Sequence, residues 1–381
     1  MSSEQSKFNA CFLFLGEPVF DGRLVNIART LSAAGKKICI IAIGIGKDVS
    51  FFENDGIIFY YIDIPLKGRT WLRWLRFLYY ARLLFKKVKA DSYWAEDIYT
   101  LYPAYRLSKM HNSKLIYDSR EIYSALGPLH KHPFKQKILT LIEKCLIRHS
   151  DEILVTGERD GEFLQKTYRL EHNIRCILNL PQYQKPVQSD YLRKNFGIPS
   201  DKKILLYQGM IHPGRGLIPI VNTLPLLHDF VLCIVGEGEF KPEVEAEAQL
   251  NGVTDRVIFC GKVNYFELHG ITCSADIGLS FIEPISYSYS LALPNKLFEY
   301  CMAGMPSLIS DLPAQRDVWE KFQFGEILPA DASAEEIAAS INNLSDTSLR
   351  VNYVEQSLKA AKFYCFESQR DTLLQIMNYG L

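Results

Sequence analysis

Several features that would place a metal or a disulfide framework are missing from this chain of 381 residues. It contains no Cys-x-x-Cys pair and no Asp-x-Asp pair, and its eight histidines show no zinc-ligand spacing. An Asp-x-Asp pair is a common way to hold Mg²⁺ or Mn²⁺ on a diphosphate, so we expect no metal site of that kind. The nine cysteines are dispersed, several in apolar segments, which predicts reduced, buried thiols in a cytosolic protein.

The chain also lacks net charge and long apolar runs. Lys plus Arg and Asp plus Glu both number 43, which argues against nucleic acid as the main partner. No apolar run reaches the roughly 18 residues of a membrane span. The N-terminal run from Cys11 to Leu15 is too short for a signal peptide and predicts a first strand. These features favour a cytoplasmic protein long enough for two domains.

One segment, residues 67–89, departs from this even balance. It carries eight basic residues and no acidic one, interleaved with aromatic side chains. Two interpretations stay open. The segment is either a peripheral contact with anionic lipid on the inner face of a membrane, or a core helix whose basic side chains extend from its ends to water.

Apolar strand patterns alternate with helical ones along most of the chain, which predicts an α/β fold with parallel, doubly wound sheets. The Pro-containing stretch Asn179–Pro186 predicts a linker. We expect two Rossmann-like domains, residues 1–180 and 181–360, with their sheets facing a central ligand cleft. A C-terminal helix, 361–381, is expected to pack back on the first domain. Predicted strands span 10–15, 37–43, 57–62, 114–118, 152–156, 176–178, 203–207, 231–235, 257–260, 277–281 and 307–310.

The most informative segment runs from Ser290 to Ser310. Pro294 suits the first position of a helix, and Gly304 suits its end. The N–H groups at such a helix start bind phosphate without a metal. Glu299, further along the helix, is suited to accept both hydroxyls of a ribose. The alternative is an ordinary βα unit in which Lys296 and Glu299 form a surface pair.

This segment, LPNKLFEYCMAGMPSLISD, resembles the signature of the group 1 (family 4) glycosyltransferases, which are retaining enzymes of GT-B fold. The resemblance implies that the helix start at Asn295 and Lys296 binds the donor diphosphate and that Glu299 binds the nucleotide ribose. Three further segments resemble the family in the same order: ILLYQGMIHPGRGL, VGEGE and DRVIFCGKV. They imply donor-binding roles for Gly209, Arg215, Gly236, Gly238 and Val263.

The first half resembles the family less closely. Its opening helix segment and the strand ending in Asp118, Ser119 and Glu121 match, but Arg120 stands where the family keeps a histidine. Gly16 is assigned to the donor site as well. We predict that Arg120, Arg215 and Lys296 are catalytic, because fixed positive charge opposes the charge on a departing diphosphate. Glu143 matches a family glutamate, with a solvated helix position as the alternative.

The implied activity moves a sugar from a nucleoside diphosphate-sugar, of UDP or GDP type, to a hydroxyl acceptor. By resemblance the acceptor is a glycan or lipid-linked glycan, the anomeric configuration is retained, and neither metal nor cofactor is needed. Met210 replaces a family arginine and Leu291 a family glutamate. These departures, with Arg120, leave open a non-catalytic sugar-nucleotide-binding protein or regulatory subunit. A sugar-nucleotide epimerase of the same fold, using Asp118 and Glu121, is the other alternative.

Overall fold

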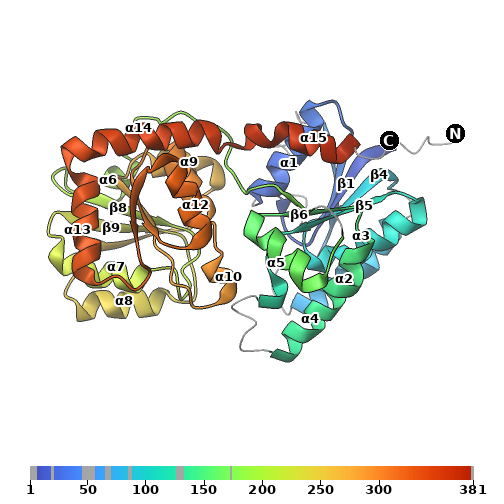
Figure 1. Ribbon diagram of the computed structural model, residues 1–381, viewed down its shortest axis with the longest axis horizontal. Helices are drawn as coiled ribbons and strands as arrows, with labels where there is room; N and C mark the ends of the chain where they lie inside the picture. The colour runs from blue at the N-terminus through green and yellow to red at the C-terminus, as the bar shows by residue number, and fades with distance from the viewer. Residues whose placement is uncertain are drawn as a thin grey trace. The chain divides into compact units, whose positions relative to one another are not determined.

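The computed structural model describes residues 7–18, 21–44, 56–64, 70–84, 88–125, 133–171 and 174–378. The chain forms two compact units, drawn in Figure 1. The first comprises residues 1–179 together with the C-terminal stretch from Gln369, and the second runs from Leu180 to Ser368. The chain therefore leaves the first unit once and returns to it once. Of the described helices, none combines the length and apolar character required to cross a membrane.

The first unit is built on a seven-stranded parallel sheet in the order β3-β2-β1-β4-β5-β6-β7. Strands such as β2 are buried along their whole length, because helices cover both faces. The strands are β1 (Phe8–Phe14), β2 (Ile38–Ile43), β3 (Ile57–Ile62), β4 (Ala90–Ala95), β5 (Lys114–Ser119), β6 (Glu152–Val155) and β7 (Ile174–Cys176). The helices are α1 (Gly22–Ala33), α2 (Thr70–Leu84), α3 (Ile98–His111), α4 (Pro133–Leu146), α5 (Glu158–Tyr168) and α15 (Arg370–Asn378).

Strand β4 and helix α3 are absent from the sequence prediction. Polar Asp91 and Ser92 obscure the strand, and Pro103 inside α3 argues against a helix. The structure accommodates the proline, because the Tyr99 carbonyl that it leaves without a helical donor accepts a hydrogen bond from Trp74 Nε1 at 2.7 Å. Tertiary contact here overrides local propensity.

The second unit is built on a six-stranded parallel sheet in the order β10-β9-β8-β11-β12-β13. The strands are β8 (Lys203–Gln208), β9 (Phe230–Val235), β10 (Val257–Gly261), β11 (Ile277–Ser280), β12 (Ser307–Ser310) and β13 (Gly325–Leu328), the last being absent from the prediction. The helices are α6 (Tyr191–Phe196), α7 (Leu217–Thr223), α8 (Lys241–Leu250), α9 (Tyr265–Thr272), α10 (Tyr287–Ser290), α11 (Asn295–Met302), α12 (Pro313–Phe322), α13 (Ala334–Ser345) and α14 (Thr347–Phe363).

The helical pattern of the closing segment also predicts one continuous helix from Val351 to Tyr379, and this prediction is wrong, because the helix is interrupted between α14 and α15. The break carries buried Phe366, whose N–H donates to the Pro181 carbonyl at 2.9 Å. Helix α15 belongs to the first unit, where it contacts α1. The expectation of buried thiols also needs a correction. All nine cysteines are free, but Cys145 is exposed and three others are half-buried.

Candidate functional site

The loops that follow β8 and β9 pack backbone against backbone at the carboxyl edge of the second sheet. Gly209 follows β8 with φ +132°, and Gly236 follows β9 with φ +144°. A Cβ on Gly236 would lie 1.9 Å from the Gly209 carbonyl oxygen, and one on Gly238 would lie 2.0 Å from that of Ile211. Only glycine permits this close approach of two loops. Parallel α/β sheets bind ligands at this edge.

Helix α11 is held against this edge by Tyr300. The buried Tyr300 hydroxyl donates to the Leu206 carbonyl of β8 at 3.0 Å and to the Leu279 carbonyl of β11 at 3.3 Å. Pro294 occupies the N-cap rather than the predicted first helical position, and no side chain of the described residues caps the helix start. The anchor fixes which α11 side chains meet the ends of β8 and β11.

Lys296, in the first turn of α11, has a buried amino group. Its Nζ has no hydrogen-bond partner among the described residues and lies 3.7 Å from the centre of the Tyr207 ring. Burial and the nearby Arg215 charge lower the pKa of Lys296 well below its usual range, with Glu299 opposing them. Arg215 is half-buried and lies over the Tyr289 ring at 4.6 Å. An anion arriving here would restore the ammonium charge.

Glu299 lies one turn along the same helix. Gln208, the last residue of β8, donates a side-chain hydrogen bond to Glu299 and accepts one from the Thr272 hydroxyl at 2.9 Å. Burial raises the pKa of Glu299 to about 7, with Gln208 and Lys296 opposing the shift. Glu299 also lines a small pocket, whose other lining residues are Pro181, Gln184, Tyr265, Leu268, His269, Thr272 and Met302.

The structure therefore brings together most residues predicted from the second half. Glu299 is bonded to Gln208, and the Arg215 and Lys296 charges influence each other. Asn295 is exposed at the start of α11. Met210 is exposed beside the glycine turn, so no cation stands there. Val263 lies half-buried against the core after β10. The sequence analysis missed Gln208 and Thr272. Gln208 could have been identified from its position directly before Gly209, whereas no sequence signal indicates Thr272.

Gly16 and Arg120 lie in the first unit. Gly16 follows β1 and accepts a hydrogen bond from the Ile43 N–H. Arg120 follows β5, and its guanidinium pairs with Asp21, Glu96 and Asp118. Three carboxylates already surround this charge, which favours a structural role over the catalytic role predicted from the sequence.

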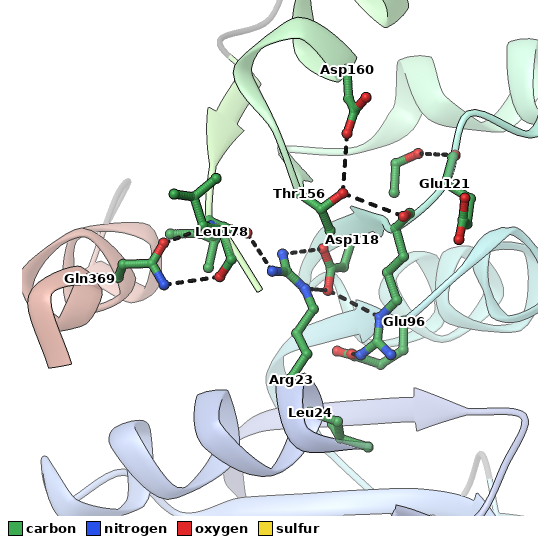
Figure 2. Close-up of polar contacts among 12 residues, drawn as sticks. Arg23, Leu24, Glu96, Asp118, Glu121, Thr156, Asp160, Leu178 and Gln369 are labelled. Carbon is green, nitrogen blue, oxygen red and sulfur yellow. Dashed lines mark hydrogen bonds and ion pairs between the residues drawn. The ribbon is translucent and has the colours of Figure 1, made fainter. Parts of the chain in front are cut away.

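A second arginine completes this charged cluster. Arg23 of α1 forms two 2.7 Å bonds to the Asp118 carboxylate, and both side chains are buried. Arg23 also donates to the Ile177 carbonyl, just beyond β7. Beside it the Gln369 side chain pairs with both backbone groups of Leu178, at 2.6 and 3.0 Å (Figure 2). The cluster thus ties β5 to the point where the chain leaves and re-enters this unit.

Glu143 is fully buried, so its alternative as a solvated helix residue is wrong. The hydroxyls of Tyr117 and Tyr168 donate to its two carboxylate oxygens at 2.7 and 2.6 Å. Burial raises the pKa of Glu143, and the two hydroxyls oppose the shift. Within the described residues, no group of three or more His, Cys, Asp or Glu side chains is placed to hold a metal ion.

Glu96 should make the stability of the protein depend on pH. Burial raises the pKa of Glu96 to about 8, although the Arg120 charge opposes it. An unfolded glutamate titrates near pH ~4.3, so between these values the folded state holds a proton that the unfolded state has lost. Stability then falls as pH rises, by at most about 1.4 kcal/mol per pH unit.

We expect Glu96→Gln to flatten this slope in urea unfolding measured from about pH 5 to about pH 9. The control is Glu171→Gln, which changes an exposed glutamate of the same unit and should leave the slope as it is. An unchanged slope in Glu96→Gln would contradict the assignment.

Comparison with known proteins supports the fold and the second unit in particular. Residues 188–361 match the family model described as "Glycosyl transferases group 1". The phosphatidyl-myo-inositol mannosyltransferase of Mycobacterium leprae is 29% identical over 173 residues, covering 44% of each chain. The matching region thus spans less than half the length of this relative.

Solved structures match along nearly the whole chain. Anabaena HepE in complex with UDP has a TM-score of 0.73 at 14% identity, covering 97% of this chain and 99% of that one. Sucrose-phosphate synthase from Thermosynechococcus elongatus has a TM-score of 0.79 at 15% identity, covering 97% and 98%. These likenesses establish the GT-B fold with its two Rossmann-like units. The resemblance to the group 1 glycosyltransferases is therefore confirmed for residues 188–361, and the likeness to solved structures shows the GT-B fold for both units.

Proposed function

We propose that the protein transfers a sugar from a nucleoside diphosphate-sugar to a hydroxyl acceptor. The observation that carries the proposal is the buried Lys296 amino group, which lacks a hydrogen-bond partner among the described residues and stands near Arg215 at the start of α11. A diphosphate supplies the negative charge and the acceptor oxygens that this place requires. The structural neighbour crystallised with UDP supports a donor of UDP type, with GDP as the second choice.

Each side chain then has a defined task. Lys296, Arg215 and the N–H groups of Asn295 and Lys296 bind the diphosphate and oppose the charge that grows as the glycosidic bond breaks. Glu299, oriented by Gln208, accepts the ribose hydroxyls. A phosphate oxygen of the leaving group takes the acceptor proton, so the sugar is transferred with retention and no strong protein base is needed. Because these cations and N–H groups meet the phosphate charge, we propose a metal-independent reaction.

The acceptor is proposed to be a glycan or a lipid-linked glycan. The mannosyltransferase similar to this chain is named for a lipid acceptor, which supports the second form. The epimerase alternative is disfavoured by Asp118. Burial alone would raise the pKa of Asp118, but Arg23 and Arg120 outweigh burial and lower it. A buried, ion-paired carboxylate of this kind is a poor general acid or base at neutral pH.

Donor binding through Glu299 tests the proposal. We expect UDP, and to a smaller extent GDP, to raise the melting temperature, because a ligand that binds only the folded state stabilises it. Glu299→Ala should weaken binding at least about tenfold, since it leaves two ribose hydroxyls without partners. For the parent protein, the rise in melting temperature with UDP should be the same when EDTA is present.

The matched control is Glu267→Ala, which removes an exposed glutamate from the neighbouring helix α9. Its UDP affinity should equal that of the parent. Equal affinity in Glu299→Ala would overturn the assignment of this residue. Binding without transfer or slow hydrolysis of any sugar nucleotide would favour the non-catalytic alternative.

A further inference from the structure

We propose that helices α2, α3 and α4 of the first unit form a surface that docks on a bilayer containing anionic phospholipid. The three helices are neighbours in one layer, since α3 contacts both α2 and α4 (Figure 1). Their exposed apolar and basic side chains are here called the basic apolar surface. Its apolar members are Trp71, Leu72, Leu75, Tyr79, Tyr80, Leu83, Tyr102, Met110, Phe134, Ile138 and Leu141, and its basic members are Arg76, Arg82, Arg106, Lys109, Lys135, Lys137 and Lys144.

The charge of this surface is of one sign. Within the three helices themselves the only acidic residue is Glu143, which is buried and accepts hydrogen bonds from two tyrosine hydroxyls. The whole chain has equal numbers of acidic and basic residues, so the positive charge here is a local segregation. The next helix in sequence, α5, carries Glu158, Asp160 and Glu162.

Helix α2 is apolar on its exposed side as well as its buried side. Phe77 and Ala81 face the core, yet the solvent side presents six large apolar residues and only two arginines, Arg76 and Arg82. Trp71 is 54% exposed. A surface helix normally places polar residues outward, so an apolar outer side indicates that something covers it.

Helix α4 repeats the pattern with regular spacing. Phe134, Ile138 and Leu141 stand at i, i+4 and i+7, which places them in one stripe, and all three are exposed. Phe134 is 75% and Leu141 62% exposed. Lys137 and Lys144 belong to the same helix. A stripe of apolar residues bordered by lysines is typical of helices that lie in the interfacial plane of a membrane.

An anionic bilayer fits this combination better than the other polyanions. Nucleic acid would attract the cations but offers no apolar layer for Leu75, Ile138 or Leu141. At a bilayer, aromatic side chains settle at the headgroup level, aliphatic ones enter the acyl boundary, and Lys and Arg meet lipid phosphates. We therefore assign the surface to a membrane, which supplies both an apolar interior and negative charge.

The sequence prediction of a lipid contact at 67–89 covers only part of this surface. Residues 65–69 and 85–87 lie outside the described structure, whereas α3 and α4 add two helices that the sequence interpretation did not include. The inference stands independently of the proposed function, because no residue of the surface belongs to the donor site. A failure of either one leaves the other unaffected.

Vesicle flotation with the full chain tests the inference. We expect the protein to float with vesicles of phosphatidylcholine mixed with phosphatidylglycerol and to remain free with phosphatidylcholine alone. Each cation near an anionic surface strengthens binding about fivefold, so the triple variant Arg76→Glu, Arg82→Glu, Lys137→Glu should lose at least ~100-fold in partitioning. A second variant, Trp71→Ser with Phe134→Ser, should also bind less and separates apolar insertion from charge.

The control for charge is Lys37→Glu, Lys166→Glu, Lys362→Glu, which reverses three exposed lysines outside the three helices and should bind like the parent. A cooperative unfolding transition in urea, compared with that of the parent, shows that each variant is folded. Absence of binding to anionic vesicles, equal binding to neutral ones, or equal losses in the control and test triples would each overturn the proposal. Loss in the charge variant without loss in the serine variant would also overturn it, because a generic polycation would behave so.

Discussion

Replacing Lys296 by methionine is expected to lower turnover by about 10²–10³-fold, the scale of losing one preorganised charge contact in a transition state. Methionine keeps an unbranched apolar stem against the Tyr207 ring, so the change removes the ammonium and little else. Removing a buried amino group without a hydrogen-bond partner among the described residues also relieves a desolvation cost, so the variant should unfold at an equal or higher urea concentration. Loss of activity with a gain in stability is the pattern that identifies a functional residue.

Lys321 provides the matched control. Its Nζ lies 3.7 Å from the centre of the Phe363 ring, the same distance as in the Lys296–Tyr207 pair, but it is exposed on α12. Lys321→Met should therefore retain parental turnover. If Lys296→Met turned over sugar nucleotide like the parent, Lys296 would have no part in the reaction, and the phosphate site would need another cation.

Replacing Arg23 by methionine should produce the largest loss of stability, about 3–5 kcal/mol in the free energy of unfolding. The change removes both 2.7 Å hydrogen bonds from the fully buried Asp118 carboxylate and leaves the Ile177 carbonyl without its arginine donor. Removing one side of a buried pair costs more than the pair itself contributes, because the remaining charge is then poorly compensated, here only by Arg120 at 3.4 Å. Urea or thermal unfolding that follows the first unit gives the measurement.

Arg316 and Asp311 offer a control of the same geometry in the second unit. They also form a two-bond arginine–carboxylate pair, but the arginine is exposed. Arg316→Met should change stability little, because water and salt screen exposed pairs. Similar losses in the two variants would show that burial does not determine the cost, contrary to the argument for Arg23.

The periodic apolar strands made the fold predictable. β2, β8, β9 and β12 lie within one residue of their predicted bounds at each end, because strands buried on both faces leave an apolar run that ends at turn residues. The missed elements lack that signal. β4 carries Asp91 and Ser92, and α3 carries a proline whose cost is offset by a tryptophan from another helix. Such compensation depends on residues far apart in sequence.

The candidate site divides in the same way. Lys296, Glu299 and the glycine turns could be identified from the sequence, because they fall within short, recognisable segments. The partners of Arg120 were not, since Asp21 and Glu96 lie 99 and 24 positions away and reach it only through the order of strands in the sheet. Gln208 was equally hidden, because its hydrogen bond to Glu299 spans 91 positions. A single sequence shows which residues have side chains suited to binding or catalysis. It does not show which of these side chains already form ion pairs or hydrogen bonds within the folded protein.

Helix α15 also bears on how the protein is made. Its Leu373 and Ile376 are fully buried, and the helix lies against α1 in the first unit. A ribosome delivers these residues only after the whole second unit, roughly 10–40 seconds later at ordinary rates of protein synthesis. During that interval the apolar surface beneath α15 stays uncovered while the second unit is already free to fold. The unit that is begun first is thus completed last.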